Sequence, residues 1–491
     1  MADSNRGSTT RGDLRRPALM LLALVAVFGL SAATLPYSID ASVGKKHGRW
    51  VAPGVRLRMY RLDAPNKVRV LTIDATAKPT VDAVLASNVL PGREQVSSMA
   101  GRTHAIAAIN GDYSRPSGRP VFTFARDGRL DQTTQLYGRN FAIDQSETSV
   151  FMAHPKTRLW IWVKASDGGG ASYEIDRMNE RSVPGQATSQ IRAFTSVGAG
   201  EERPPHGGCY VRLRAKQAPR AASPTRAPRR GGTPIAVAGI EQRHVVEKQQ
   251  CRYQRVPPNG GITLYSPRDG SHADTLRSMS VGSSVVFGWS LGWPDVFDSV
   301  GGNPTLIENG AVQKQSIYGS DSFVSGRHPR TAVAYNDRSN KLFLVTVDGR
   351  QPNYSRGMTL AGLTHFLRSR LGATDALNLD GGGSTTMVVN GTIRGRPSDG
   401  SERLVSSALV VLNGDDPGEH LGAGTSQSEQ LFAPLPLPSI PAEDSSYAAM
   451  VQDPASVGGL SEWLEHQGHD LPRFLERTAD DFRATQGPTT D

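Results

Sequence analysis

NLDGGGSTT, residues 378–386, is the most informative run of this sequence. It follows an alternating apolar segment at 376–379 and precedes Met-Val-Val-Asn-Gly at 387–391, a pattern that predicts a strand ending in a turn. Three adjacent glycines weaken any regular element, and they are retained where the backbone turns sharply or approaches a ligand closely. Their amides can form an anion-binding concavity, to which the hydroxyl residues add short donors. The run therefore predicts a ligand site around Asp380, with a plain flexible hairpin loop as the alternative.

Short β-rich runs separated by turn residues continue on both sides of this motif, whereas helical periodicity is rare. Helices are predicted at 359–371, with Gly372 as the stop signal, and within 81–100. The strands predicted in the same way lie at 104–109, 121–124, 140–143, 159–163, 261–265, 283–289, 330–335, 341–347 and 407–412, with a hairpin at 55–74. Strands do not alternate regularly with helices, which argues against a doubly wound fold. We expect an α+β fold with a mostly antiparallel or mixed β-sheet core, few helices, and polar Gly-rich loops at strand ends.

Length and charge divide the 491 residues into one main domain with flanking segments. We place the domain at 54–413 and interpret 414–491 as a linker rich in Pro, Ser and acid that ends in a short helical stretch. The formal charge is +9, but the excess is concentrated between 211 and 255. Without an even basic face, a zinc-finger spacing or a Walker-type loop, nucleic acid is not an expected partner.

The first forty residues resemble an export signal. Arginines before residue 17 form a basic start, residues 17–30 are apolar, and residues 31–33 supply the small side chains of a cleavage site. The apolar run is short for a membrane span. We expect a signal peptide at 1–40, or alternatively an uncleaved anchor that associates the protein with a membrane. Either reading predicts a secreted or extracytoplasmic protein.

Cys209 and Cys251 are the only cysteines of the chain. Outside the cytoplasm a disulfide between them is expected, closing a loop of roughly 40 residues worth about 3–4 kcal/mol in the chain-entropy model. Within this loop, residues 212–234 are basic and rich in Ala, Pro and Gly, which predicts a disordered insertion. Such an insertion could tether the protein to an acidic polymer or could simply be solvated. Two cysteines alone cannot complete a closed structural zinc site.

Five further segments combine polar side chains with glycines or turns near strand ends. They are NGDY at 110–113, GGNP at 301–304, HPRT at 328–331, VDGR at 347–350 and SDGSER at 398–403. Each alone is an ordinary turn signal. Their number favours a binding site built from loops on a rigid scaffold.

In this order, together with GMTL at 357–360, the segments resemble the phosphodiester glycosidase family. The resemblance extends over roughly 54–413 and is densest from 301 onward. It departs from the family after Asp112, where Tyr113 is followed by Ser114 and Arg115 instead of a second aromatic residue. The resemblance implies an exported glycosidase that cleaves the bond between a sugar's anomeric carbon and a phosphodiester. Its partner would be a phosphodiester-linked glycan or glycopolymer, such as a cell-surface or exopolysaccharide glycan.

The chemistry of that reaction suggests a role for each of the polar residues. An oxocarbenium-like transition state needs a carboxylate beside the anomeric carbon, for which we choose Asp380. Glu402 or Asp348 would activate water, and Arg330 would clamp the phosphate bidentately. The residues expected to bind substrate are Asn110, Asp112, Gly302, Thr331, Gly381, Gly382, Gly383, Ser384, Thr385 and Arg403. Among these, the amides of the glycine run would complete an anion pocket.

Two other classes of function remain open at this stage. The domain could be a non-catalytic module that binds carbohydrate or cell-wall polymer through the same clusters. It could also be a metal-dependent phosphodiesterase, because four acidic residues offer the oxygen ligands that Mg²⁺ or Ca²⁺ prefers. These four residues are Asp112, Asp348, Asp380 and Glu402. A divalent cation is thus the one cofactor that we consider, and its ligands are not fixed by the sequence.

Overall fold

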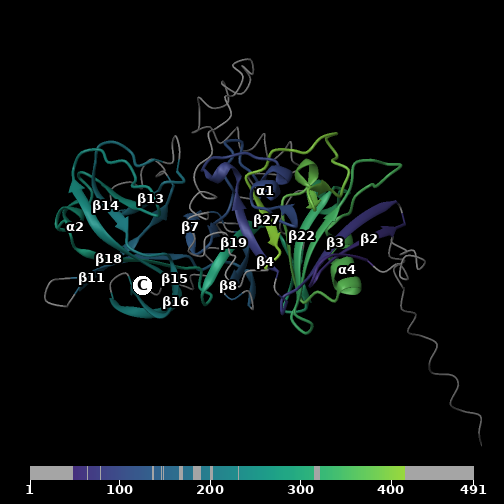
Figure 1. Cartoon of the computed structure of the whole chain (residues 1–491), viewed down its shortest axis with the longest axis horizontal. Coiled ribbons are helices and arrows are strands. Elements are labelled where there is room, and N and C mark those ends of the chain that lie inside the picture. The colour runs from purple at the N-terminus through teal and green to yellow at the C-terminus, as the bar shows by residue number, and fades with distance from the viewer. Residues whose placement is uncertain are drawn as a thin grey trace, which may run out of the picture. The chain divides into compact units, whose positions relative to one another are not determined.

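The computed structural model (Figure 1) describes residues 48–414 except for 64, 78, 135, 137, 145, 147–148, 165–169, 181–189, 199–202, 230–231 and 315–320. The predicted export signal and the tail from 415 onward lie outside the described residues. Within the described part, none of the helices has the length and apolar character needed to cross a membrane.

Four β-sheets account for most of the described chain, and all of their strand pairs except β12–β13 are antiparallel. The eight-stranded sheet has the order β1 (Arg49–Ala52), β2 (Val55–Leu62), β3 (Asn66–Asp74), β23 (Lys341–Val347), β22 (Arg330–Asn336), β24 (Asp375–Asn378), β20 (Thr305–Glu308) and β21 (Ala311–Val312). One five-stranded sheet has the order β26 (Thr392–Ile393), β25 (Met387–Val389), β5 (Ala107–Asn110), β27 (Ser407–Leu412) and β4 (Thr80–Leu85). These two sheets supply the strands that end at the site.

The other two sheets are built from the middle of the chain. The second five-stranded sheet has the order β7 (Arg129–Gln132), β6 (Phe124–Arg126), β19 (Val296–Gly302), β8 (Arg139–Asp144) and β9 (Val150–Ala153). The nine-stranded sheet has the order β11 (Gly170–Ile175), β10 (Arg158–Lys164), β18 (Ser284–Ser290), β16 (Gly232–Gln250), β14 (Gly208–Ala215), β17 (Ile262–Pro267), β13 (Arg192–Thr195) and β12 (Arg177–Met178), with β15 (Arg220–Arg229) paired to β16. The described helices are α1 (Val96–Arg102), α2 (Ala273–Arg277), α3 (Asp321–Ser325) and α4 (Leu360–Leu371). This composition confirms the α+β prediction.

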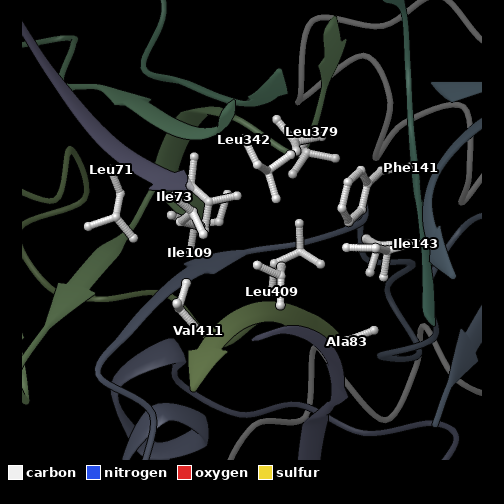
Figure 2. Packing of buried hydrophobic residues seen from close by; sticks show 14 of the residues in the cluster. Leu71, Ile73, Ala83, Ile109, Phe141, Ile143, Leu342, Leu379, Leu409 and Val411 are labelled. Carbon is white, nitrogen blue, oxygen red and sulfur yellow. The ribbon is translucent and has the colours of Figure 1, made fainter. Parts of the chain in front are cut away.

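A single apolar core joins the eight-stranded sheet to both five-stranded sheets. Ile73 of β3, Ile109 of β5 and Phe141 of β8 point into it (Figure 2) and are 2 % exposed or less. Leu379, fully buried in the same cluster, directly precedes Asp380. Burying such side chains stabilises the fold by roughly 1.5–3 kcal/mol each. The core therefore fixes the point at which the glycine run begins.

Local sequence signals explain the helix α4. The Thr359 side chain accepts a hydrogen bond from the Gly362 amide (3.0 Å), which caps the first turn. At the other end Gly372 adopts the left-handed conformation with φ of 66°, as the predicted stop signal requires. The structure thus confirms this helix at both boundaries.

One local prediction is confirmed over only part of its range, and another differs from the structure. The helix expected within 81–100 is present as α1, which begins at Val96, whereas the first part of the range is the strand β4, because pairing with β27 along Thr80–Leu85 overrides helix propensity. The strand expected at 121–124 begins only at Phe124. Ahead of it, the amide of Phe122 donates to the Asp112 side chain (2.8 Å) instead of to a neighbouring strand.

The insertion at 212–234, predicted to be disordered, is largely β-structure. It takes in the end of β14, the whole of β15 and the start of β16, and β15 pairs antiparallel with β16. Composition suggested disorder because Ala, Pro and Gly rarely build strands. The long strand β16 supplies a ladder partner that composition does not reveal.

The predicted disulfide is present between Cys209 and Cys251. Cys209 lies in β14, and Cys251 directly follows β16, the strand that pairs with β14. The bond therefore closes the segment that contains β15 and β16.

We expect the double variant Cys209→Ala, Cys251→Ala to unfold with a free energy about 3 kcal/mol lower than the unmodified protein, because the disulfide closes a 42-residue separation. Urea titration followed by tryptophan fluorescence measures this loss. Reduction of the unmodified protein with dithiothreitol should give a similar loss. Equal stability of oxidised protein and variant would show that the cross-link does not limit unfolding.

Candidate active site

A pocket forms where three strands of the eight-stranded sheet and one strand of a five-stranded sheet reach their ends. Asp380 follows β24, Arg350 follows β23, Arg330 begins β22, and Tyr113 follows β5. The full lining is Tyr113, Phe323, His328, Pro329, Arg330, Arg350, Asp380, Gly381 and Gly382. The structure thus brings together four of the polar segments predicted to form a site. A separate hollow between β6, β7 and the nine-stranded sheet contains none of the predicted site residues.

Asp380 is held at the pocket by its main chain. Its amide donates to the Gly111 carbonyl (3.2 Å), and its carbonyl accepts from Asn110 Nδ2 (2.7 Å). The residue is only 8 % exposed. Burial raises the pKa of Asp380 to about 6, against the opposing effects of a hydrogen bond from the Ser384 side chain and the charges of Arg403 and Arg350. This carboxyl group therefore titrates close to neutral pH.

Asp112 is a second carboxyl group in the electrostatic field of the first. It is fully buried; its Oδ2 accepts from the Phe122 amide (2.8 Å), while Oδ1 has no hydrogen-bond partner. Burial, reinforced by the charge of Asp380, raises the pKa of Asp112 to about 8. At neutral pH it is a protonated acid without solvent access, so the predicted contact with substrate is not available in this arrangement.

Asn110 and Thr331, also predicted to bind substrate, are instead internal connectors. Asn110 Oδ1 accepts from the Thr331 hydroxyl (2.8 Å) and from the Thr386 amide (3.2 Å). Both Asn110 and Thr331 are fully buried. Gly302 is likewise a packing position, since a Cβ there would lie 2.5 Å from the Asn378 carbonyl oxygen. These residues shape the pocket from behind.

The glycine run was predicted to present free amides to an anion, but one of its three glycine amides and the two amides that follow the run are bonded inside the protein. The amide of Gly382 donates to the Pro329 carbonyl (3.0 Å), that of Ser384 to Gly381 (3.2 Å), and that of Thr385 to Gly382 (3.2 Å). The Thr385 hydroxyl lies 3.3 Å from that of Thr331. The run therefore acts mainly as a tight turn.

Arg330 does not form the predicted bidentate clamp on phosphate. Its guanidinium is buried and donates from Nε to the Met358 carbonyl (2.9 Å), and from Nη2 to Phe323 (2.6 Å) and Gly326 (3.1 Å). Main-chain carbonyls thus occupy the edge of the guanidinium that would grip an anion. Arg330 ties together the loops that surround the pocket.

Neither of the predicted second carboxylates lines the pocket. Glu402 accepts from the amide (2.8 Å) and hydroxyl (2.5 Å) of Ser97 at the start of α1. Asp348 forms a buried ion pair with Arg69 (2.7 Å). Both contacts are typical of structural carboxylates, at a helix N-terminus and in an internal pair.

Arg403 and the predicted acidic metal ligands are also engaged elsewhere. Arg403 Nη2 lies 2.6 Å from Asp399 Oδ2, beside Gly383. Among the described residues, no group of three or more His, Cys, Asp and Glu side chains is arranged to hold a metal ion. The four carboxylates considered as ligands are thus not gathered into one site.

Two residues that the sequence reading passed over stand out in the pocket. Arg350 is exposed, and its Nη2 lies 3.2 Å from the position that a Gly382 Cβ would occupy. His328 has its Nε2 3.0 Å from the Ser322 carbonyl oxygen, which assigns the ring proton to Nε2. Its Nδ1 is buried and has no hydrogen-bond partner, and burial lowers the pKa of His328. Both residues belong to motifs that sequence alone could only describe as turns.

Known proteins resemble part of this chain. Residues 235–412 match the family model for phosphodiester glycosidases. Human N-acetylglucosamine-1-phosphodiester alpha-N-acetylglucosaminidase is 29 % identical over 245 residues, 46 % of this chain and 44 % of its own. The bovine protein of the same name is 30 % identical over 268 residues, 48 % and 46 % respectively. The alignments thus span less than half the length of these curated relatives.

Solved structures show a looser likeness. A protein from Synechocystis aligns over 73 % of this chain and 61 % of its own, with 20 % identity and a TM-score of 0.48. This similarity is too distant to add to the assignment.

We expect Asp112→Asn to stabilise the protein increasingly as pH rises. The folded-state pKa of about 8 is above the ordinary value, so the stability that protonated Asp112 contributes is complete at acid pH and is lost as pH rises through 8. An amide cannot ionise and avoids this loss. In urea unfolding, the free energy of unfolding of the variant minus that of the unmodified protein should increase by at least about 1 kcal/mol between pH 5 and pH 9. A constant difference across this range would contradict a raised pKa.

Proposed function

We propose that this protein is an exported phosphodiester glycosidase, a hydrolase that cleaves the bond between a sugar's anomeric carbon and a phosphodiester in surface or exopolysaccharide glycans. One observation carries the proposal: a buried carboxyl group with a raised pKa, Asp380, and an exposed guanidinium, Arg350, line the same pocket. The family match and the names of the curated relatives, which act on a sugar 1-phosphodiester, support it. The apolar segment near the N-terminus supports export.

Asp380 would act at the anomeric carbon, as nucleophile or as electrostatic partner of the oxocarbenium-like transition state. Both roles require the ionised form. With a pKa raised to about 6 by burial, the carboxylate is formed at neutral pH yet poorly solvated, which strengthens its interaction with positive charge.

Arg350 would stabilise the departing phosphate. A phosphodiester oxygen leaves as an anion far more readily than a sugar hydroxyl does, so the reaction needs little general-acid help. Electrostatic stabilisation of that anion is then the larger contribution. Arg350 replaces Arg330 in this role because its guanidinium reaches the pocket beside Gly382.

His328 would take the role first assigned to Glu402 or Asp348. Its Nδ1 has no hydrogen-bond partner and is shielded from solvent, so it would accept a proton from the attacking water once substrate binding admits that water. Burial, which lowers the pKa of His328, keeps the ring neutral and able to accept. The bond from Nε2 to the Ser322 carbonyl orients the imidazole for this purpose.

A purely binding role is the second candidate. The same pocket could retain a sugar phosphate without turnover, but a carboxyl group with a strongly raised pKa in a pocket is more typical of catalysis. Release of reducing sugar from a glycosyl 1-phosphodiester separates the two roles.

We expect Asp380→Asn to lower turnover of a chromogenic sugar 1-phosphodiester by about 1,000-fold or more, since the amide cannot stabilise the cationic transition state. The unmodified enzyme should gain kcat/KM as pH rises through about 6, where the carboxylate forms. The midpoint temperature of thermal unfolding of the variant at pH 7.5 should equal or exceed that of the unmodified protein. Undiminished turnover in the variant would show that Asp380 does not take part in catalysis.

We expect Arg350→Gln to reduce kcat for the same substrate by about 100-fold, the usual cost of losing one group that stabilises a developing anion. Arg338→Gln is the matched control, because Arg338 lies exposed in the turn between β22 and β23, at the opposite end of these strands. Steady-state kinetics of both variants check the assignment. Equal losses in the two would mean that only overall positive charge matters.

A further inference from the structure

A dense group of positive charges surrounds Tyr354, close to the pocket but outside it. Lys67 Nζ lies 3.4 Å from the centroid of the Tyr354 ring, and Arg396 Cζ lies 5.4 Å from it. Arg69 Nη2 donates to the Tyr354 hydroxyl (3.2 Å). We call Lys67, Arg69, Tyr354 and Arg396 the Tyr354 surface.

Positive charge on this surface exceeds the negative charge beside it. Burial and the charges of Arg61 and Arg69 lower the pKa of Lys67, and the charge of Asp348 opposes this shift. Asp348 already pairs with Arg69 at 2.7 Å. Arg61 and Arg396 are exposed. Like charges crowded in this way repel one another, and a bound anion would relieve the repulsion.

The Tyr354 surface continues directly from the pocket. Arg350 lines the pocket, and the next residue, Gln351, donates from Nε2 to the Arg396 carbonyl (3.0 Å). The Arg396 amide in turn lies 3.3 Å from Asp348 Oδ1. The loop between Arg350 and Tyr354 is folded on itself by hydrogen bonds between the main chains of Gln351 and Ser355 (3.1 and 2.8 Å). Hydrogen bonds thus join the loop that carries Arg350 and Tyr354 to the segment that carries Arg396.

We propose that the Tyr354 surface binds a second phosphate of the substrate, on the aglycone side of the bond that is cleaved. The substrate would then be a polyanionic glycan with repeating phosphodiesters, and not an isolated sugar diester. This inference rests on the proposed function. Because Arg350 is proposed to hold the scissile phosphate, the Tyr354 surface would lie on the aglycone side of the bound glycan. Lys67 supplies a compact point charge, and Arg396 can grip phosphate oxygens in pairs.

The test is the double variant Lys67→Gln, Arg396→Gln. We expect KM for an oligosaccharide of several phosphodiester-linked units to rise about tenfold, equivalent to about 1.4 kcal/mol, with kcat unchanged. Kinetics on a single sugar 1-phosphodiester with a small neutral aglycone should not change. The matched control Lys248→Gln, Arg338→Gln removes two exposed charges elsewhere and should leave both substrates unaffected. An unchanged KM for the oligomer in the Lys67 and Arg396 variant would overturn the proposal.

A binding measurement separates this proposal from the proposed function. Inorganic polyphosphate, titrated calorimetrically into the Asp380→Asn protein, should bind about tenfold more weakly when Lys67 and Arg396 are also replaced. It should bind equally well when Lys248 and Arg338 are replaced. Failure of every sugar diester to react would refute the glycosidase, while loss of polyphosphate binding would still locate the anion site. Equal polyphosphate affinity of the Asp380→Asn protein with and without the Lys67 and Arg396 replacements would refute the anion site and leave the glycosidase proposal intact.

Discussion

The buried side chain of Asn110 is the contact on which the site depends. It ends the strand β5 of one sheet, accepts a hydrogen bond from Thr331 in β22 of another, and donates to the carbonyl of Asp380. One amide group, which donates one hydrogen bond and accepts two inside the protein, thereby links two sheets to the reactive loop. A buried amide with these partners is costly to rearrange, because any shift would leave polar groups unpaired away from water. The carboxylate of Asp380 therefore takes its position from a network that never touches a substrate.

Burial gives the two neighbouring carboxyl groups, Asp112 and Asp380, different pKa values. Asp112 is fully buried and has a pKa near 8, whereas Asp380 reaches the pocket and has a pKa near 6. Between these values one group is neutral and the other is charged. Pairs whose environments separate their pKa values in this way are characteristic of acid–base sites. Because Asp112 stays protonated, it does not repel the charge that Asp380 must carry.

The sequence predicted what local rules determine and missed what distant partners determine. Strand–loop alternation identified the β-rich fold, and Thr359 with Gly372 marked one helix at both ends. By contrast, the Asp348–Arg69 pair joins residues 279 positions apart in the sequence (348 minus 69), and Glu402 serves a helix that begins some three hundred residues earlier. A carboxylate in a Gly-rich turn gives no local sign of whether it faces a pocket or a buried arginine. For this reason the sequence named three candidate carboxylates correctly as polar loop residues but could not choose among them, and it overlooked Arg350 and His328.

The three glycines after Asp380 are explained by close approach and not by free amides. A Cβ on Gly381 would lie 2.8 Å from the Pro329 carbonyl oxygen, and one on Gly382 would lie 3.2 Å from Arg350 Nη2. A Cβ on Gly383 would lie 1.9 Å from Asp399 Oδ2, the ion-pair partner of Arg403. Real Cβ atoms do not reach the distances found at Gly381 and Gly383 without moving their neighbours, and the distance at Gly382 is tighter than most real contacts. Each glycine thus admits a different loop, and two of these loops bring an arginine toward Asp380. The cost of three glycines in succession is offset by placing a carboxylate between cations in a site with little water.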